Sequence, residues 1–362
     1  MESVEHHLDR PDRLEPLGGA EFAPKQTYLN TSACALLPRR TIDAVVALAE
    51  ETADGRPGGA GDFEVADEAR AAFARLAHTT PDRVALGSSV SVHVGMVAQS
   101  MPPGAEILFP EGDFSSVSTP FTVRGDLKTR FVPLDRLAES VRPETALVAF
   151  SAVQSADGRT ADFAAVRAAA AAHGARTLLD ATQSAGWLPL HAEEWDFTVS
   201  GGYKYLLCPR GASFLTVTAE AQDALLPIHA GWVTGEELWS NSYGPVRELA
   251  RSARRFDEPP AFLSYHGAAR SLALLEEIGI ERIEAHNKTL AARFRAGLAA
   301  LGHPAVADDS TVVGVPGMGE RAQALRAAGV LLSARAGNLR ASFHLYNSSA
   351  DVDRALEVLA AG

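Results

Sequence analysis

Short hydrophobic runs alternate with alanine-rich helical segments over roughly the first two thirds of the chain. Apolar or β-branched runs of strand length follow Val84, at 107–109, 146–150, 177–179, 197–199 and 214–217. Segments of helical composition lie between them, such as 90–100 and 162–173. Strands without polar alternation are buried on both faces, which is typical of a largely parallel sheet covered by helices. The pattern predicts an α/β domain.

The pattern changes beyond Arg255. The segment Asp257-Glu258-Pro259-Pro260 is a break, and a long helix-compatible stretch then runs from 266 to 298. A last α/β-like segment ends in a helix that begins at Asp351. We therefore expect a large domain over 31–255 and a smaller α/β domain over 256–362 together with 1–30.

Composition excludes several classes of protein. With 33 Lys and Arg against 45 Asp and Glu, the net charge of the 362-residue chain is −12. Such an acidic surface argues against nucleic acid or anionic lipid as the main partner. The two cysteines, Cys34 and Cys208, exclude a disulfide framework or a zinc cluster, so no metal is expected.

The expected location is the cytoplasm. Residues 1–10 are rich in charge where a secretory signal would carry an apolar stretch. No apolar run in the chain is long enough to cross a bilayer.

One lysine stands in an unusual setting. Ser200-Gly201-Gly202-Tyr203-Lys204-Tyr205 directly follows the expected strand at 197–199. Lys204 therefore lies at a strand end on a glycine-containing turn, where active-site groups of α/β folds collect. A lysine is usually a solvated surface residue. The aromatic neighbours and the two flanking buried strands favour a functional role here.

Asp180 ends the expected strand at 177–179 and lies 24 residues before Lys204. By itself, such an aspartate is equally well explained as a helix cap. Together, the two residues fit pyridoxal phosphate, which needs a lysine for its Schiff base and a carboxylate that keeps its ring nitrogen protonated. The phosphate of this cofactor needs donors at a helix start, and Gly87-Ser88-Ser89 precedes an expected helix at 90–100.

With these motifs, the chain resembles the class V aminotransferases, a family of fold-type I pyridoxal-phosphate enzymes. That family includes cysteine desulfurases, kynureninases and isopenicillin N epimerase-like proteins. The resemblance runs from Tyr28 almost to the C-terminus. It implies that the large domain binds pyridoxal phosphate on a mostly parallel seven-stranded sheet. It also implies a homodimer with shared active sites.

The resemblance assigns roles to individual residues. Lys204 matches the Schiff-base position, and Asp180 with Gln183 matches an Asp-x-x-Gln signature that places Gln183 near the phenolic oxygen of the cofactor. Arg340 matches the arginine that binds the substrate carboxylate. The remaining implied contacts are Ser88, Ser89 and Tyr203 to the phosphate, Phe114 stacked on the ring, and Trp232 reaching the phosphate from the partner subunit.

The chain also departs from the family pattern. The family often has a Gly-Thr pair, which donates to the partner's phosphate, where this chain has Asp257 to Pro260. The asparagine that commonly contacts the phenolic oxygen is replaced, so that either Gln154 or Ser155 can substitute for it; Ser155 is included in the expected site. No cysteine follows Cys208. A persulfide-forming desulfurase is therefore not expected.

These residues predict an enzyme that acts on a small α-amino acid. Transamination, the family's default, is the first interpretation. A Cβ–S or Cβ–C lyase and an amino-acid epimerase are the alternatives, because all three reactions begin with a proton removed from Cα. A non-catalytic scaffold of the same fold is a remote alternative, which the presence of Lys204, Asp180 and Arg340 disfavours.

Overall fold

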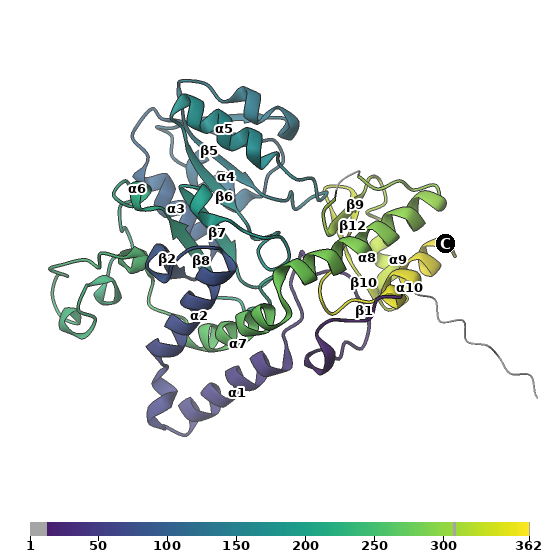
Figure 1. The fold of residues 1–362 in the computed structure, drawn as a ribbon, viewed down its shortest axis with the longest axis horizontal. Helices are drawn as coiled ribbons and strands as arrows, with labels where there is room; N and C mark the ends of the chain where they lie inside the picture. Colours follow the sequence, from purple (N-terminus) through teal and green to yellow (C-terminus); the bar gives the residue numbers. More distant parts are fainter. Residues whose placement is uncertain (1–12, 307–308, 362) are drawn as a thin grey trace, which may run out of the picture.

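The computed structural model describes residues 13–306 and 309–361, and the expectation for residues 1–10 lies outside this range. A seven-stranded sheet forms the centre of the larger part of the molecule (Figure 1). Its spatial order is β2 (Val84–Gly87), β8 (Ser213–Val217), β7 (Phe197–Gly201), β6 (Arg176–Asp180), β5 (Thr145–Ser151), β3 (Glu106–Pro110) and β4 (Lys128–Val132). β8 alone in this sheet runs antiparallel to its neighbours. The predicted mostly parallel seven-stranded sheet is confirmed.

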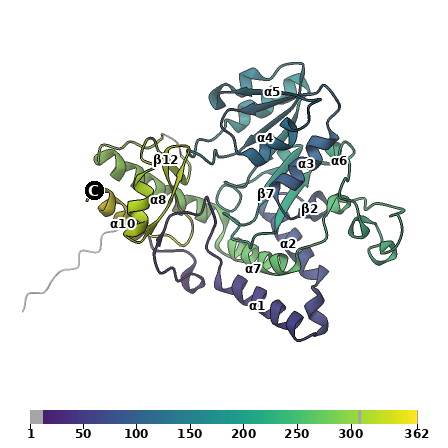
Figure 2. The ribbon, with the colours of Figure 1, turned by 180° about the vertical axis from the view of Figure 1, so that it is seen from behind.

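Helices cover both faces of this sheet, which gives three layers (Figure 2). One face packs against α2 (Phe63–Leu76), α5 (Phe163–His173) and α7 (Phe262–Ile278). The other face packs against α3 (Val90–Ser100), α4 (Ser115–Thr122) and the short α6 (Ala219–Gln222). α1 (Arg39–Ala53) lies outside them, against α7. Strands such as β3 and β8 are buried along their whole length, whereas the edge strand β4 is partly exposed.

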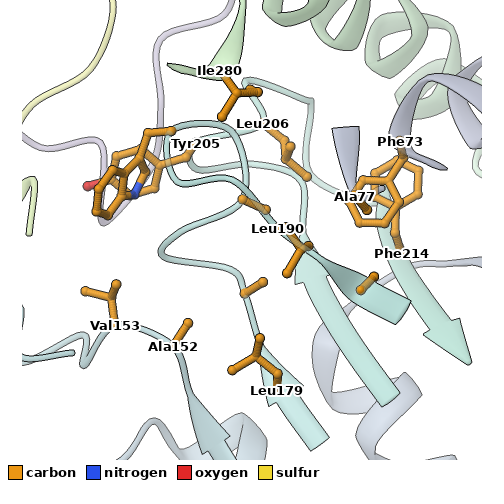
Figure 3. Packing of buried hydrophobic residues seen from close by; sticks show 14 of the residues in the cluster. Phe73, Ala77, Ala152, Val153, Leu179, Leu190, Tyr205, Leu206, Phe214 and Ile280 are labelled. Atoms are coloured by element: carbon orange, nitrogen blue, oxygen red, sulfur yellow. The ribbon is translucent and has the colours of Figure 1, made fainter. Parts of the chain in front are cut away.

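Aromatic stacking joins the first helical layer to the sheet. The rings of Phe73 on α2 and Phe214 on β8 stack with centroids 4.3 Å apart (Figure 3). Both side chains are fully buried, and burial of one such ring contributes about 1.5–3 kcal/mol. Tyr265 on α7 meets Phe214 edge to face, and its hydroxyl donates to the carbonyl oxygens of Gly87 and Ser213. These contacts hold the end of β2, which leads into Ser88 and Ser89.

A second group of elements surrounds the C-terminal part of the chain. β11 (Ser333–Arg335), β12 (Asn338–Ser342) and β9 (Val312–Val315) form an antiparallel sheet. β1 (Thr27–Tyr28) pairs in parallel with β10 (Val330–Leu331). Three helices pack on these strands: α8 (Ile280–Ala300), α9 (Arg321–Ala327) and α10 (Ser349–Ala360). α10 begins with a capping box between Ser348 and Asp351, close to the predicted start.

The helix-compatible stretch expected over 266–298 is divided between two helices, α7 and α8. Gly279 separates α7 from α8 with φ +90°, a backbone conformation that only glycine adopts without strain. α7 packs against α1 and α2, whereas α8 packs against α10 and β9. We propose that the domain boundary falls at Gly279 and not at the expected residue 256.

Candidate active site

A cavity lies where the carboxyl ends of the parallel strands meet. Asp180 is the last residue of β6, Ser151 is the last residue of β5, and Lys204 follows β7 in the next turn. Ligands of α/β folds bind at this edge of the sheet. The cavity is lined by Ser89, Val90, Ser91, Phe114, Ser116, Ser151, Ser155, Asp180, Thr182, Gln183, Tyr203 and Lys204.

Lys204 is only 5% exposed. The turn that presents it is tight, because a Cβ on Gly202 would lie 2.8 Å from the carbonyl oxygen of Ala212. Its Nζ lies 5.3 Å from the ring centroid of Phe114 and 5.6 Å from that of Tyr203. Burial lowers the pKa of Lys204 to about 8, against the opposing effect of Asp180. About a tenth of this amine is therefore neutral and nucleophilic at pH 7, far more than for an ordinary lysine, whose pKa is about 10.4.

Asp180 is a buried carboxylate that lines the same cavity as this amine. It is 4% exposed, and its Oδ1 accepts a hydrogen bond of 2.8 Å from the backbone N–H of Thr182. Burial raises the pKa of Asp180 to about 6, while Thr182 and Lys204 act in the opposite direction. The group is therefore mostly ionised at neutral pH, in a position fixed by the backbone. Such a carboxylate can hold a proton on a basic ring nitrogen.

The first turn of α3 faces the same cavity. Ser89 is its N-cap residue and makes no side-chain cap bond; its hydroxyl lies 3.2 Å from that of Ser91. The first N–H groups of a helix have no partner within the helix and attract anions. The neighbouring Ser88, which sequence reasoning also placed at the phosphate, does not line the cavity. Its N–H and hydroxyl both donate to Glu258.

Arg340 comes from β12 of the small sheet and reaches the cavity wall. Its Nη1 donates to Ser155, at 2.9 Å from the hydroxyl oxygen, and its Nε donates to Ser333. Gln183 also donates to Ser155, through Nε2 at 3.1 Å. Two buried polar atoms here, Nη2 of Arg340 and Oε1 of Gln183, have no partner. Buried polar groups are almost always satisfied, so these two atoms are suited to a bound polar molecule.

Two other expected residues lie differently. Ser155 lines the cavity, whereas Gln154 is buried and is not among the lining residues. Trp232 lies outside the cavity of its own chain. Its ring stacks on Trp239 with centroids 5.5 Å apart and meets Phe63 edge to face. Within this chain, the structure does not bring Trp232 together with Lys204.

Sequence reasoning missed Asp113, which organises one wall of the site. Its carboxylate accepts from the N–H of Ser151 at 2.7 Å and from the N–H of Phe114 at 2.6 Å. It thereby joins the end of β5 to the start of α4 and fixes the backbone that carries the Phe114 ring. Burial raises the pKa of Asp113. A strand-end acidic residue next to an aromatic one, in Gly112-Asp113-Phe114, was the available signal.

Comparison with known proteins identifies the family of this chain. The family model for class V aminotransferases matches residues 27–315. The uncharacterized aminotransferase YcbU of Bacillus subtilis is 30% identical over 319 residues, which cover 83% of this chain and 84% of the relative. Isopenicillin N epimerase of Amycolatopsis lactamdurans is 28% identical, with 58% of each chain covered.

A solved structure shares the fold. The cystine C-S lyase C-DES, in complex with cysteine persulfide, superposes with a TM-score of 0.84 at 22% identity, covering 93% of this chain and 97% of that one. The match to the family model over most of the chain, supported by the relative at 30% identity, settles the classification. This chain belongs to the class V aminotransferase family.

Proposed function

We propose that this protein transfers the amino group of a small α-amino acid, with Lys204 as the residue that binds the cofactor and moves protons. As a member of the class V aminotransferases, it is a pyridoxal-phosphate-dependent enzyme. The observation that carries the proposal is the pairing of buried Lys204 with buried Asp180 in one cavity at the strand ends. The pKa values of about 8 and about 6 give the lysine a raised neutral fraction and keep the aspartate mostly ionised at neutral pH.

The residues present fit this cofactor. Asp180 supplies the carboxylate for a ring nitrogen, and Phe114 supplies an aromatic face 5.3 Å from the lysine amine. Ser89 and the N–H groups of the first turn of α3 supply donors for a phosphate. Among the described residues, Oε1 of Gln183 and Nη2 of Arg340 are buried polar atoms without a hydrogen-bond partner, and a polar ligand would supply one. When bound, the cofactor supplies an electron sink that stabilises negative charge at the substrate Cα.

Each residue then has a defined task. Arg340 orients the substrate by pairing with its α-carboxylate, for which the guanidinium fork is well matched. Lys204 removes the proton from Cα, since a neutral buried amine is an effective base; for amino transfer that proton would pass to the cofactor and not back to Cα. Asp113 keeps Phe114 in place through the backbone.

A lyase is the second candidate function. The specific observation in its favour is Tyr203 before the lysine; its ring lines the cavity and carries the Arg210 guanidinium 4.0 Å from its centroid. This arrangement places a cation on the ring of a cavity-lining residue, where it would favour negative charge that develops nearby. An amino-acid epimerase remains a third interpretation, since Lys204 moves the same proton in that reaction.

A panel of amino acids tests the reaction type. We expect the purified protein to convert at least one α-amino acid to its keto acid while the bound cofactor gains the amino group. Keto acid, sulfide, ammonia and enantiomer composition should be followed together. Release of ammonia or sulfide with pyruvate would identify a lyase, and loss of optical purity alone would identify an epimerase; either result would contradict aminotransfer.

The same panel should show no persulfide chemistry with L-cysteine. Cys208 is buried, its thiol contacts the carbonyl oxygen of Leu206, and burial raises the pKa of that thiol far above its usual range. Cys34 does not line the cavity, and its thiol contacts the carbonyl oxygen of Ala35. The thiol of Cys208 is held protonated by its burial, and a protonated thiol is a poor nucleophile. Stoichiometric alanine with a persulfide trapped on either cysteine would contradict this expectation.

We also propose a homodimer with shared active sites. The support is the aromatic cluster that Trp232, Trp239, Phe63 and Phe262 form away from the cavity. Trp239 is 70% exposed in the single chain, and large exposed aromatic residues are typical of interfaces. The segment around residues 230–250, which includes Trp232 and Trp239, projects from the body of the molecule (Figure 1).

We expect the wild-type protein to sediment as a dimer and Trp239→Glu to shift it toward monomer. A charged side chain would have to be buried in that interface, which costs free energy unless the charge is paired. Ala172→Glu, at an exposed position on α5 away from this segment, is the charge-matched comparison. A wild-type monomer that binds a full complement of cofactor would contradict the shared-site proposal.

In the described residues, no helix has the length and apolar character that crossing a membrane requires. We propose a cytoplasmic location, which is supported by two free cysteines and no disulfide among the described residues.

A further inference from the structure

The carboxylate of Glu258 binds the phosphate loop of its own chain. Its Oε2 accepts a hydrogen bond of 2.7 Å from the N–H of Ser88 and one of 2.8 Å from the Ser88 hydroxyl. These are the two donors that sequence reasoning assigned to the cofactor's phosphate. An anion of the protein therefore occupies donors that an anion of the ligand would otherwise use.

Glu258 is held at this place by the backbone around it. Its N–H donates to the carbonyl oxygen of Leu86, at 3.0 Å, so the segment runs along the end of β2. The preceding Asp257 is fully buried and accepts from the N–H of Leu86 at 2.8 Å. Asp257 also pairs with the buried guanidinium of Arg70 at 2.7 Å. Pro259 follows, and the residue before a proline has few accessible backbone conformations.

The loop is shaped to admit this carboxylate. A Cβ on Gly87 would lie 3.1 Å from Oε2 of Glu258 and 2.8 Å from Nε2 of His93. The absence of a side chain at Gly87 therefore lets Glu258 approach Ser88. His93 is buried, bonds to the hydroxyl of Ser213, and has a pKa lowered by burial to about 4, so it does not neutralise the carboxylate.

We propose that Glu258 is an affinity-setting residue for the cofactor: its carboxylate occupies the donors of Ser88 and repels the adjacent phosphate. This inference rests on the proposed function. The phosphate is then bound by Ser89 and the first turn of α3, without Ser88. Because Ser88 and Ser89 are consecutive, the carboxylate and the phosphate are neighbours. A carboxylate beside a phosphate at a partly exposed position weakens binding by about fivefold, after screening by solvent and salt.

The test compares dissociation constants of pyridoxal phosphate for apoprotein variants, measured by tryptophan fluorescence and by equilibrium dialysis. Glu258→Gln removes the charge and keeps an oxygen that accepts from Ser88, so it should bind pyridoxal phosphate about fivefold more tightly. Pyridoxal, which lacks the phosphate, should bind both proteins equally. Glu144→Gln is the matched control, since the side chain of Glu144 is 69% exposed. Glu144 lies just before β5, at the amino ends of the strands, whereas the cavity lies at their carboxyl ends.

Serine variants provide a second, independent readout. Ser88→Ala should change the dissociation constant less than twofold, whereas Ser89→Ala should weaken binding at least fivefold. In a Glu258→Ala background the Ser88 donors are free, so Ser88→Ala should then weaken binding. This coupling between the two positions is what a double-mutant cycle measures.

The outcomes separate this inference from the proposed function. Unchanged or weaker binding by Glu258→Gln, equal tightening toward pyridoxal, or equal losses for the two serine variants would each overturn the inference, while wild-type binding would leave the proposed function standing. A wild-type protein that binds no pyridoxal phosphate would overturn both.

Discussion

Replacing Lys204 with alanine should lower turnover by about a thousandfold or more and remove all covalent attachment of the cofactor. Among the described residues, its side chain is the one amine that lines the cavity, and burial gives it a pKa of about 8. Alanine supplies neither a nucleophile nor a base, and the loss of a positioned base alone costs about 10²–10⁴-fold. The measurement is single-turnover kinetics on the best substrate of the amino-acid panel.

A variant at a distant lysine controls for general damage. Lys128 begins β4, the edge strand farthest from β2 in the sheet, and is exposed. Lys128→Ala should keep wild-type turnover and cofactor content. If Lys204→Ala retained more than a tenth of the wild-type rate, the role assigned to Lys204 would be wrong.

Replacing Asp180 with asparagine should lower turnover about a hundredfold or more while leaving the fold intact. The amide has nearly the same shape and can still accept from the N–H of Thr182. It carries no negative charge, however, so it does not hold a proton on the cofactor's ring nitrogen. The absorbance of the bound cofactor, which reports ring protonation, should change together with the rate. Unchanged absorbance and rate would contradict the assignment.

The stability of the apoprotein gives a readout of Asp180 that is independent of catalysis. The pKa of this carboxyl is raised by burial from 3.8 to about 6. Its contribution to stability is therefore fully present below pH 4 and is lost as the pH rises through 6. Asp180→Asn does not titrate, so its melting temperature should fall less than that of the wild type between pH 4 and 6.5.

The elements that form the site could be predicted because their signals are local. Lys204 and Asp180 follow apolar strands, and the carboxyl ends of parallel strands meet at one edge whatever the loops do. The structure accordingly places both residues in one cavity. Most of the large sheet was predictable for the same reason, since strands such as β3 and β5 lack polar alternation. The edge strand β4, which contains Lys128 and Arg130, shows no such pattern, and the number of seven strands came from the family resemblance.

Other features depended on contacts between distant segments. The break at Gly279 was missed because helical periodicity continues on both sides of a single glycine. Residues 88 and 89 are both serines, so the sequence does not distinguish them. The structure does, because the donors of Ser88 are bound to Glu258, 170 residues later in the chain. Arg340 was identified by resemblance alone, because no local pattern indicates that β12 reaches Ser155.

The central claim, that Lys204 carries the cofactor, is tested most directly by borohydride reduction of the holoprotein followed by peptide mapping. Reduction fixes pyridoxal phosphate to the amine that holds it, and the modified peptide identifies that amine without reference to substrate or reaction. The account predicts one pyridoxyl group per chain, on Lys204. Modification of any other lysine, or of none, would contradict it.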